Sequence, residues 1–399
     1  MRTFEEIGLN PQLVGAVKKL GFTHPTQIQE ESIPYILDGR DILGESATGS
    51  GKTLAFGVGV IDKVVPKQGL QALILTPTRE LAEQVKDSLV KFSFQKPLKI
   101  IAIYGGVSIN PQIKDLYTAD VVIATPGRLL DHVQRRTINF SKIRLLVLDE
   151  ADRMLDMGFM EDVEKIIKLC PVKRQTLFFS ATILSSIKKL AGRYMNNPVS
   201  VFAEKMVDPT KLKQEYYDIT KNLKVSLLLH LLQNEKSGLV MVFCNTRRTT
   251  DFVVKNLRVN KMDAIAIHGG LSQNKRTRTI ELFNKAKVTV LVCTDVAARG
   301  LHIDNVSHVY NYDIPRDPND YVHRIGRTAR AGEEGKVVNL LSPEDHDNFS
   351  RVKRDYSFSI EKMQKPFLKE VNRVFPEKRH FSERSSGQRP RFHRKFSQR

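Results

Sequence analysis

A glycine-rich segment near the amino terminus has the composition of a phosphate-binding loop. The residues ESATGSGKT (45–53) follow GRDILG and precede an apolar stretch of helical character. At such a junction, backbone N–H groups at the start of a helix can surround phosphate oxygens. Lys52 would then reach the β- and γ-phosphates of ATP, and Thr53 would ligate Mg²⁺. Taken alone, the segment is equally compatible with an ordinary helix-start turn, and Ser46 stands where the general pattern prefers glycine or alanine. The residues expected to surround the phosphates are Ser46, Ala47, Thr48, Gly49, Ser50, Gly51, Lys52 and Thr53.

A second segment supplies the acids that hydrolysis of a phosphate ester requires. LLVLDEAD (145–152) is an apolar strand that ends in carboxylates. Asp149 is placed to hold a metal ion through water, and Glu150 to orient and deprotonate the attacking water. The same acids could instead be satisfied surface groups that cap a helix. Their occurrence together with a phosphate loop favours a site that hydrolyses ATP.

The elements that must position these residues recur with a regular rhythm. Short apolar runs that end in turn residues alternate with amphipathic stretches, the pattern of buried parallel strands joined by helices, so the expected fold class is α/β. The second half echoes the first, because IIAIYGG (100–106) and AIAIHGG (264–270) are both strands closed by paired glycines. We therefore expect one doubly wound module used twice. The predicted strands lie in QALILTPTREL, KIIAIYGG, DVVIATPGR, RLLVLDEAD, TLFFSAT, GLVMVFCNT, DAIAIHGG, VTVLVCTDVAARG, HVYNYD and GKVVNLL.

Composition divides the chain into two domains, a linker and a tail. Residues 1–204 and 213–366 are the expected domains, because the segment 205–212 between them is polar and contains a proline. From 367 to 399 the chain is basic and lacks apolar periodicity, which predicts a disordered tail. The tail contributes either solubility or, because phenylalanines alternate with its arginines, a sequence-tolerant tether for nucleic acid.

The overall charge indicates the class of partner. The 399 residues include 63 Lys and Arg against 44 Asp and Glu, a formal charge of +19, which favours a polyanion such as nucleic acid over the alternative of a membrane surface. No apolar run approaches the roughly 20 residues that span a bilayer. Cys170, Cys244 and Cys293 are odd in number and widely separated, with no CxxC, which argues against a disulfide framework and a zinc site. We expect a cytosolic protein.

A set of motifs, in this order and context, resembles the DEAD-box RNA helicases over roughly residues 1–365. The resemblance implies two RecA-like domains, ATP and Mg²⁺ as cofactors, and ATP hydrolysis coupled to clamping and local strand separation of RNA. It also implies that the protein binds RNA with little preference for sequence. It further implies that the protein does not bind a membrane and acts as a monomer. The motifs are GFTHPTQIQ (21–29), ATGSGKT (47–53), PTREL (77–81), Gly105–Gly106, TPGR (125–128), DEAD (149–152), SAT (180–182), VFCNT (242–246), QNKR (273–276), TDVAARG (294–300) and HRIGRTAR (323–330).

The resemblance gives roles to the arginines of HRIGRTAR. Arg327 and Arg330 would reach the γ-phosphate of ATP from the opposite domain once the cleft closes. They are one helical turn apart and would share a face, which argues against the alternative of scattered RNA-contacting or solvent-facing charges. His323 and Arg324 would link the motif to the acids of DEAD and to the domain interface.

The SAT motif would act as a relay between ATP hydrolysis and RNA unwinding. Ser180 and Thr182 carry hydroxyl groups able to bond Asp152 and His323. Their loss should uncouple unwinding from hydrolysis more than it stops hydrolysis. An ordinary strand end with satisfied hydroxyl groups is the alternative.

The resemblance also implies a base-recognition site in GFTHPTQIQ. Gln29 would read the adenine edge, because an amide can satisfy both its donor and its acceptor, while Phe22 would stack on the ring. Phe4 could support this pocket or be an ordinary core residue.

The RNA track is expected at strand ends and at the starts of the helices that follow them. Backbone N–H groups, hydroxyl groups and guanidiniums in such places hold phosphates without reading bases, although each residue alone could be a turn or a cap. The residues assigned to RNA are Thr78, Arg79, Gly106, Thr125, Pro126, Gly127, Arg128, Thr246, Arg247, Gln273, Arg276, Thr294 and Gly300.

One position departs from the family pattern. His302 occupies the place where the family usually has an aspartate that accepts hydrogen bonds from the ATP ribose. Closure on ATP could therefore be weaker or pH-sensitive.

Two other classes of protein are compatible with the same sequence. One is an RNA-binding clamp whose ATPase times release, and the other is a translocating DNA helicase on the same plan.

Overall fold

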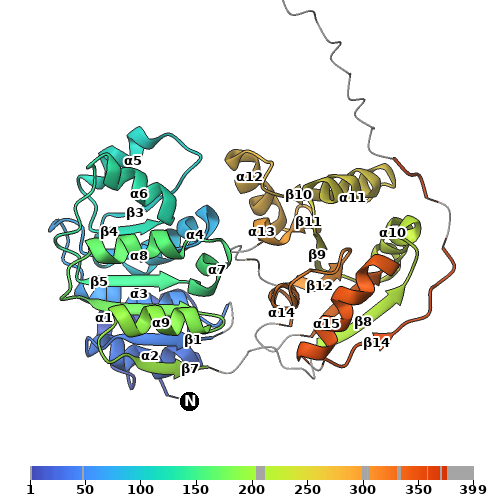
Figure 1. Cartoon of the computed structure of the whole chain (residues 1–399). Coiled ribbons are helices and arrows are strands. Elements are labelled where there is room, and N and C mark those ends of the chain that lie inside the picture. The colour runs from blue at the N-terminus through green and yellow to red at the C-terminus, as the bar shows by residue number, and fades with distance from the viewer. Residues whose placement is uncertain are drawn as a thin grey trace, which may run out of the picture.

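The chain forms two domains, each built on a seven-stranded parallel sheet (Figure 1). The computed structural model describes residues 2–46, 49–203, 212–298, 303, 306–329, 334–356, 358–368 and 371–374. Helices cover both faces of each sheet, which confirms the predicted α/β class with two RecA-like domains.

The first domain contains the strands β1 to β7 and the helices α1 to α9. Its strands are β1 (Ile42–Glu45), β2 (Ala72–Leu75), β3 (Ile100–Ile103), β4 (Val121–Ala124), β5 (Leu145–Asp149), β6 (Gln175–Ser180) and β7 (Val199–Phe202). Its helices are α1 (Pro11–Lys19), α2 (Gln27–Leu37), α3 (Lys52–Lys63), α4 (Arg79–Phe92), α5 (Ile109–Leu116), α6 (Pro126–Gln134), α7 (Ala151–Asp156), α8 (Met160–Leu169) and α9 (Ser185–Tyr194).

The second domain repeats this pattern with the strands β8 to β14. These are β8 (Leu212–Asp218), β9 (Leu239–Cys244), β10 (Ala264–Ile267), β11 (Val290–Thr294), β12 (Val306–Asn311), β13 (Gly335–Leu341) and β14 (Glu361–Lys362). Its helices are α10 (Lys224–Asn234), α11 (Arg247–Val259), α12 (Gln273–Asn284), α13 (Asp295–Ala298), α14 (Pro318–Ile325) and α15 (His346–Tyr356), with 3₁₀ turns η1 (Lys221–Leu223) and η2 (Pro343–Asp345).

The two sheets have the same strand order. It is β3-β4-β2-β5-β6-β1-β7 in the first domain and β10-β11-β9-β12-β13-β8-β14 in the second, so adding seven to each strand number converts one into the other. The prediction of one module used twice is therefore confirmed. Because all pairings are parallel, the carboxyl ends of the strands lie along one edge of each sheet, where ligands bind in folds of this type.

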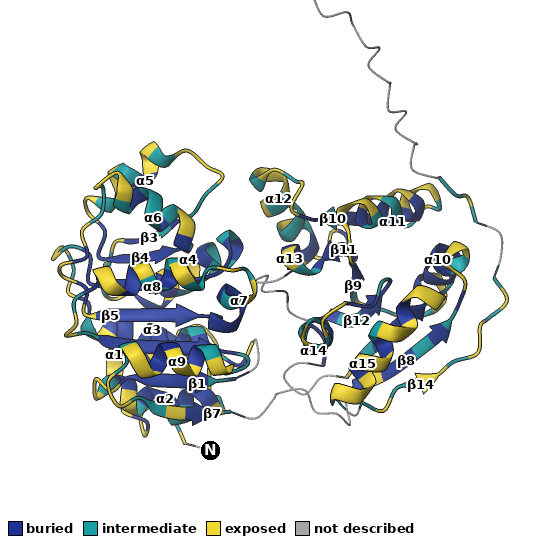
Figure 2. Ribbon diagram, in the orientation of Figure 1, coloured by how far each residue is buried: buried dark blue, intermediate teal, exposed yellow. Residues whose placement is uncertain are grey.

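Apolar layers on both faces of each sheet hold the helices in place. In the first domain α2, α3 and α4 pack on one face and α6, α8 and α9 on the other. The inner strands are buried on both sides, as Figure 2 shows, which explains why they are continuous apolar runs in the sequence. Phe4 is fully buried in the first of these layers and is thus a core residue.

All ten predicted runs contain a strand, but β1, β7, β8 and β14 were missing from the prediction. β8 was missed because its sequence, LKQEYYD, is polar. In the structure Glu215 of β8 is buried and pairs with Lys213 and Lys336, which satisfies its charge. Leu212, the last residue of the predicted linker, is the first residue of β8, while 204–211 lie outside the described residues.

The second domain continues into the segment expected to be tail. β14 pairs with β8 at the edge of the sheet, and Leu368 and Val371 then pack on the core beside α10 and α11. Asn256 on α11 exchanges two hydrogen bonds with the backbone of Val374, at 2.9 and 3.0 Å, and Asn260, the C-cap of α11, exchanges two with the backbone of Asn372, at 2.8 and 3.1 Å. We call residues 367, 368 and 371–374 the terminal strap. They belong to the second domain, and the predicted tail from 375 onwards lies outside the described residues.

Candidate functional site

The glycine-rich loop connects β1 to the first turn of α3, as the sequence predicted. Gly51 adopts a left-handed conformation (φ 92°) at the N-cap of α3, a conformation that glycine allows without strain. Lys52 is buried and its Nζ donates to the carbonyl oxygen of Ser46 at 2.7 Å, so the loop closes on itself. Ser46 and Ser50 share a hydroxyl hydrogen bond of 2.8 Å. Ala47 and Thr48 lie outside the described residues.

Gln29, the expected adenine reader, is bound to this loop. Its Nε2 donates to the carbonyl oxygen of Gly51 at 3.0 Å, and its Oε1 accepts from the backbone N–H of Thr26 at 3.0 Å. A side chain at position 51 would collide with the Gln29 amide. The Gln29 amide can still donate one more hydrogen bond from Nε2 and accept one more at Oε1. The ring of Phe22 is 39% exposed and packs edge-on against Phe92, with 6.4 Å between ring centroids.

Asp149 ends β5 in a buried position opposite the loop. Its Oδ1 is buried without a hydrogen-bond partner among the described residues. Burial and the nearby charge of Glu150 raise the pKa of Asp149 to about 7, although the Lys52 ammonium acts in the opposite direction. Burial likewise lowers the pKa of Lys52. A buried, unbonded carboxylate oxygen is suited to a hard cation or its water.

A cation at this position would have few protein ligands. Within the part of the chain that the structure describes, no group of three His, Cys, Asp or Glu could hold a metal ion. Mg²⁺ is commonly held by one or two side chains and by substrate phosphates, which fits a site made by Asp149 and Thr53.

Glu150 has an uncommon backbone conformation for a non-glycine residue. It lies at the N-cap of α7 with φ 55° and ψ 52°, in the left-handed region that costs a non-glycine residue about 1–3 kcal/mol. Its buried Oε2 accepts from Nη1 of Arg153 at 3.0 Å. Strain of this kind is frequent at catalytic residues.

Asp152 and the SAT motif are joined by a set of short-range bonds. One oxygen of Asp152 accepts from the hydroxyl group of Thr182 at 3.1 Å and from the backbone N–H of Thr182 at 3.0 Å. The hydroxyl group of Ser180 accepts from the N–H of Asp152 at 3.2 Å. The expected contact between these hydroxyl groups and Asp152 is therefore present, because β5 and β6 are adjacent strands.

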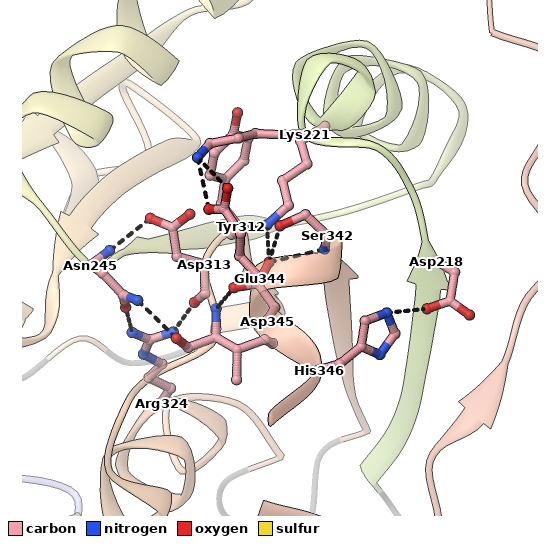
Figure 3. Close-up of polar contacts among 12 residues, drawn as sticks. Asp218, Lys221, Asn245, Tyr312, Asp313, Arg324, Ser342, Glu344, Asp345 and His346 are labelled. Atoms are coloured by element: carbon pink, nitrogen blue, oxygen red, sulfur yellow. Dashed lines mark hydrogen bonds and ion pairs between the residues drawn. The ribbon is translucent and has the colours of Figure 1, made fainter. Parts of the chain in front are cut away.

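In the second domain, Arg324 is buried in a polar network (Figure 3). It binds both oxygens of Asp295, at 2.6 and 2.7 Å, and also Asn311, Asn245 and the carbonyl oxygen of Asp313. Burial alone would lower the pKa of Arg324, but the charge and hydrogen bonds of Asp295 raise it. Arg324 thus binds within its own domain, whereas the sequence had suggested a link to the acids at 149–152.

Of the other residues of the HRIGRTAR motif, the structure describes all but Arg330. Arg327 is 2% exposed and follows α14, and His323 lies on α14 itself. Arg330 lies outside the described residues, as do Gly300 and His302. Because α14 ends at Ile325, Arg327 lies beyond the helix, and the expectation that Arg327 and Arg330 share a helical face is wrong for Arg327.

Two RNA-track segments have the same local geometry in the two domains. Thr78 caps α4 by accepting from the N–H of Leu81 at 3.2 Å, and Thr246 caps α11 by accepting from that of Thr249 at 3.0 Å. Arg79 and Arg247 follow these caps and lie against the paired glycines of their own domains, Gly106 and Gly269 respectively. Gly106 has φ 80°, and a side chain there would collide with the Arg79 guanidinium.

The TPGR segment begins α6. Thr125 is its N-cap and Pro126 its first residue, and a side chain added at Gly127 would meet open space. Arg128 instead points into the protein: its guanidinium donates to the carbonyl oxygen of Val107 at 3.1 Å and to the side chain of Gln112 at 3.2 Å. Thr294, in the second domain, ends β11 and is buried.

Two residues that the sequence assigned to RNA binding, Gln273 and Arg276, also join the two domains. Glu80, in the first turn of α4, accepts from Nη2 of Arg276 at 3.1 Å and from Nε2 of Gln273 at 3.0 Å, both on α12. Helices α4 and α12 lie on the facing sides of the two domains in Figure 1. Glu80, Gln112, Arg153 and Asp295 were not among the predicted site residues. The partners of Glu80, Gln112 and Asp295 are distant in sequence, and Arg153 follows the DEAD motif without belonging to it.

Comparisons with known proteins agree with this geometry. The DEAD/DEAH box helicase model matches residues 26–190, and the model of the helicase conserved C-terminal domain matches residues 223–332. The DEAD-box ATP-dependent RNA helicase CshA of Geobacillus kaustophilus is 42% identical over 375 residues, which cover 93% of this chain and 80% of that protein. The chain belongs to the DEAD-box ATP-dependent RNA helicases. CshA of Listeria monocytogenes is 43% identical over 370 residues, covering 92% of this chain and 71% of its own.

Solved structures of DEAD-box proteins have the same architecture. Dbp5 of S. cerevisiae bound to RNA and ADP BeF3 gives a TM-score of 0.83 at 30% identity, with 91% of this chain and 96% of Dbp5 covered. A DEAD box protein of Methanococcus jannaschii is 40% identical, with coverages of 91% and 99%, but gives a TM-score of 0.56.

This helicase uses ATP, as its family does, and no helix among the described residues is long and apolar enough to cross a membrane. The three cysteines are free and buried, in agreement with the absence of a disulfide framework.

Proposed function

We propose that this helicase hydrolyses ATP in an RNA-stimulated reaction that closes the two domains on a strand and melts short duplexes locally. The observation that carries the proposal is the contact of Glu80 with Arg276 and Gln273 between the domains. All three residues belong to segments that resemble RNA-contacting motifs. The site that would bind RNA is therefore also a site where the domains meet, so that RNA binding and closure favour each other.

The nucleotide would bind in the first domain. The glycine-rich loop from Ser46 to Thr53 would hold the phosphates, with Lys52 neutralising the outer ones, and Gln29 and Phe22 would hold adenine. Thr53 and Asp149 would hold Mg²⁺, which, when bound, neutralises charge that develops on the phosphate oxygens. Glu150 would orient the attacking water and take its proton. The unbonded oxygen of Asp149 and the strained backbone of Glu150 support these assignments.

The second domain would complete this site when the cleft closes. Arg327 and Arg330 would stabilise charge on the γ-phosphate, an effect of about 10³–10⁵ in rate in other nucleotide hydrolases. The buried network of Arg324 supports this role indirectly, since it fixes the end of α14 from which Arg327 follows. Asp152, Ser180 and Thr182 would transmit closure to the acids, with His323 as their counterpart in the second domain.

RNA would lie across both domains, bound mainly through its phosphates. Thr78, Arg79, Gly106 and the TPGR segment would hold it in the first domain, and Thr246, Arg247, Gln273, Arg276, Thr294 and Gly300 in the second. Contacts of this kind give little sequence preference and a strong dependence on salt. We further propose that the helicase acts as a monomer, and that it works in a reducing compartment such as the cytosol, where buried free thiols persist.

The decisive experiment is ATP turnover with and without single-stranded RNA, on the wild type and on Glu150→Gln. We expect RNA to stimulate the wild type at least tenfold, and the variant to retain RNA binding without turnover. Single-stranded DNA serves as the control, and a strand-displacement assay with a short RNA duplex tests melting. Equal stimulation by DNA, or turnover without displacement, would contradict the proposal and would instead indicate a DNA helicase or an RNA clamp.

A further inference from the structure

The paired glycines of the first domain lie in a loop that is held at both ends. The loop joins β3 to α5, and Gly106 and Val107 are exposed. Before the glycines, the carbonyl oxygen of Tyr104 accepts from Nε2 of Gln112 at 3.0 Å. After them, the carbonyl oxygen of Val107 accepts from Nη2 of Arg128 at 3.1 Å. One side chain from α5 and one from α6 therefore fix the loop.

These two side chains are bonded to each other. Nη1 of Arg128 donates to Oε1 of Gln112 at 3.2 Å. The same oxygen lies 3.2 Å from Nε2 of His132, one turn further along α6. We call Gln112, Arg128 and His132 the loop clamp. The TPGR segment forms the start of α6. The clamp therefore connects the glycine loop to the TPGR segment, which is also expected to contact RNA.

The hydrogen bonds fix the orientation of each group in the clamp. His132 is fully buried, and burial together with the charge of Arg128 lowers its pKa, so the ring is neutral. With Nε2 protonated, the ring donates to Gln112, and the hydroxyl group of Thr137 donates to Nδ1 at 2.8 Å in preference to the carbonyl oxygen of His132 at 3.1 Å. A reversed Gln112 amide would direct N–H groups at the Arg128 guanidinium and at His132, so only one orientation satisfies every partner.

The way α5 is attached shows that the clamp is not ordinary core packing. Among the residues of α5, all of which the structure describes, Gln112 alone is buried. Leu116 packs against the core from the end of α5, but the buried side chain of this helix is polar, and its bonds all serve the loop and α6. Such bonds are directional, so they define the position of a loop better than apolar contacts do.

We propose that Gln112 is a positioning residue for RNA binding, which acts with Arg128 and His132 to hold the Gly105–Gly106 loop and the first turn of α6 as one rigid platform. The inference rests on the proposed function, because it takes Gly106 and residues 125–127 of the TPGR segment as RNA contacts. It assigns Arg128 to the platform interior and not to the RNA surface. A loop ordered before binding loses less conformational freedom when RNA binds, and so binds RNA more tightly.

The test compares Gln112→Leu with Gln134→Leu, which makes the same change at an exposed position of α6. We expect Gln112→Leu to raise about tenfold the concentration of single-stranded RNA that gives half-maximal ATPase stimulation. Turnover at saturating RNA and the KM for ATP should stay within about twofold of the wild type, and Gln134→Leu should be unchanged. Equal losses in RNA affinity, turnover and the KM for ATP would show a merely structural residue and overturn the proposal.

Two further comparisons keep the result specific. His132→Gln retains an N–H near the position of Nε2, whereas His132→Leu does not, so RNA affinity should be near normal in the first variant and weakened in the second. Gln112→Leu and Arg128→Lys break the same clamp, so the double variant should lose little more RNA affinity than either single variant. Losses that multiply would mean that the two residues act independently, which contradicts the clamp.

Failure of this inference can be told apart from failure of the proposed function. Arg79→Ala removes a guanidinium that lies against Gly106 without belonging to the clamp. If Arg79→Ala weakens RNA binding and Gln112→Leu does not, the clamp is wrong and the RNA track stands. If neither variant changes RNA affinity, the RNA track in the first domain is wrong as well.

Discussion

The carboxylate of Glu80, in the first domain, lies 3.1 Å from a guanidinium nitrogen of Arg276, in the second. Both side chains are largely buried, at 4% and 14% exposure, and Gln273 adds a hydrogen bond of 3.0 Å to the same carboxylate oxygen. An ion pair removed from water in this way is costly to break on one side, because a buried charge loses its partner. The contact therefore opposes separation of the domains.

Loss of the Glu80 carboxylate should weaken closure. In Glu80→Ala, Arg276 keeps its charge but has no carboxylate at this position, and we expect RNA-stimulated turnover at subsaturating RNA to fall about 10–100-fold. The exposed acid Glu161 on α8 provides the control variant Glu161→Ala. Basal ATP turnover should change little in either case.

The exchange Glu80→Arg with Arg276→Glu checks that charge pairing is responsible. Partial recovery of RNA-stimulated turnover relative to Glu80→Arg alone is the expected result. A fluorescence distance between labels in the two domains should lengthen in Glu80→Ala. If that distance and the turnover remain as in the wild type, the contact does not support closure.

The buried carboxyl of Asp149 should make the nucleotide-free protein sensitive to pH. Its pKa is raised to about 7, so the folded state holds a proton that the unfolded state releases above its ordinary pKa near 4. The stabilisation that this proton gives the folded state is complete below about pH 4, and it is lost as the pH rises from there through 7. Asp149→Asn, which cannot ionise, should lack this dependence.

Thermal unfolding at two pH values measures the effect. At pH 4 the wild type and Asp149→Asn should have similar Tm values, because the carboxyl is then largely protonated in both the folded and the unfolded state. At pH 8 the variant should be more stable by about 1–4 kcal/mol, since one pKa unit corresponds to about 1.4 kcal/mol. A difference of the same size at both pH values would mean that the carboxyl does not titrate in this range.

The hydroxyl group of Thr182 should matter for coupling more than for hydrolysis. In Thr182→Val the backbone N–H groups of Ala181 and Thr182 still donate to Asp152, at 3.2 and 3.0 Å, so the carboxylate keeps its place. We expect RNA-stimulated ATP turnover within about threefold of the wild type, but several-fold fewer duplexes separated per ATP. Measurement of both rates in one reaction gives this ratio, and a fall in both by the same factor would argue against a relay.

The sequence was sufficient for the parts of the fold and site that depend on local patterns. The apolar runs, the glycine-rich loop and the acids at the end of β5 are each contained in one short segment, so periodicity and motif order predicted them. Arg324 shows the limit: its burial depends on Asp295, Asn311 and Asn245, the last of them 79 residues away. Nothing in HRIGRTAR distinguishes a structural arginine from one that reaches a ligand. Gln112 belongs to no motif, and only the fold brings it between Tyr104 and Arg128.

The terminal strap gives a final prediction, because its attachment has matched spacings. Asn260, the C-cap of α11, follows Asn256 by four residues, a rise of about 6 Å along the helix. They bind Val374 and Asn372, two residues apart in an extended segment, which spans about 6.6 Å. Each amide donates to a backbone carbonyl and accepts from the N–H of the same residue, so the strap is held without regard to its side chains.

Asn256→Ala should release the end of the strap. Asn256 is fully buried, and its loss leaves the N–H and carbonyl groups of Val374 unpaired, at an expected cost of about 1–3 kcal/mol in the stability of the second domain. Arg373, whose guanidinium donates to Ser226 at 2.9 Å, should become a faster site of trypsin cleavage, as mass spectrometry would show. Asn274→Ala, at an exposed position on α12, is the matched control. A chain ending at Val374 should keep the wild-type Tm of the second domain and one ending at Pro366 should not; equal Tm values for the two would show that the strap contributes nothing to stability.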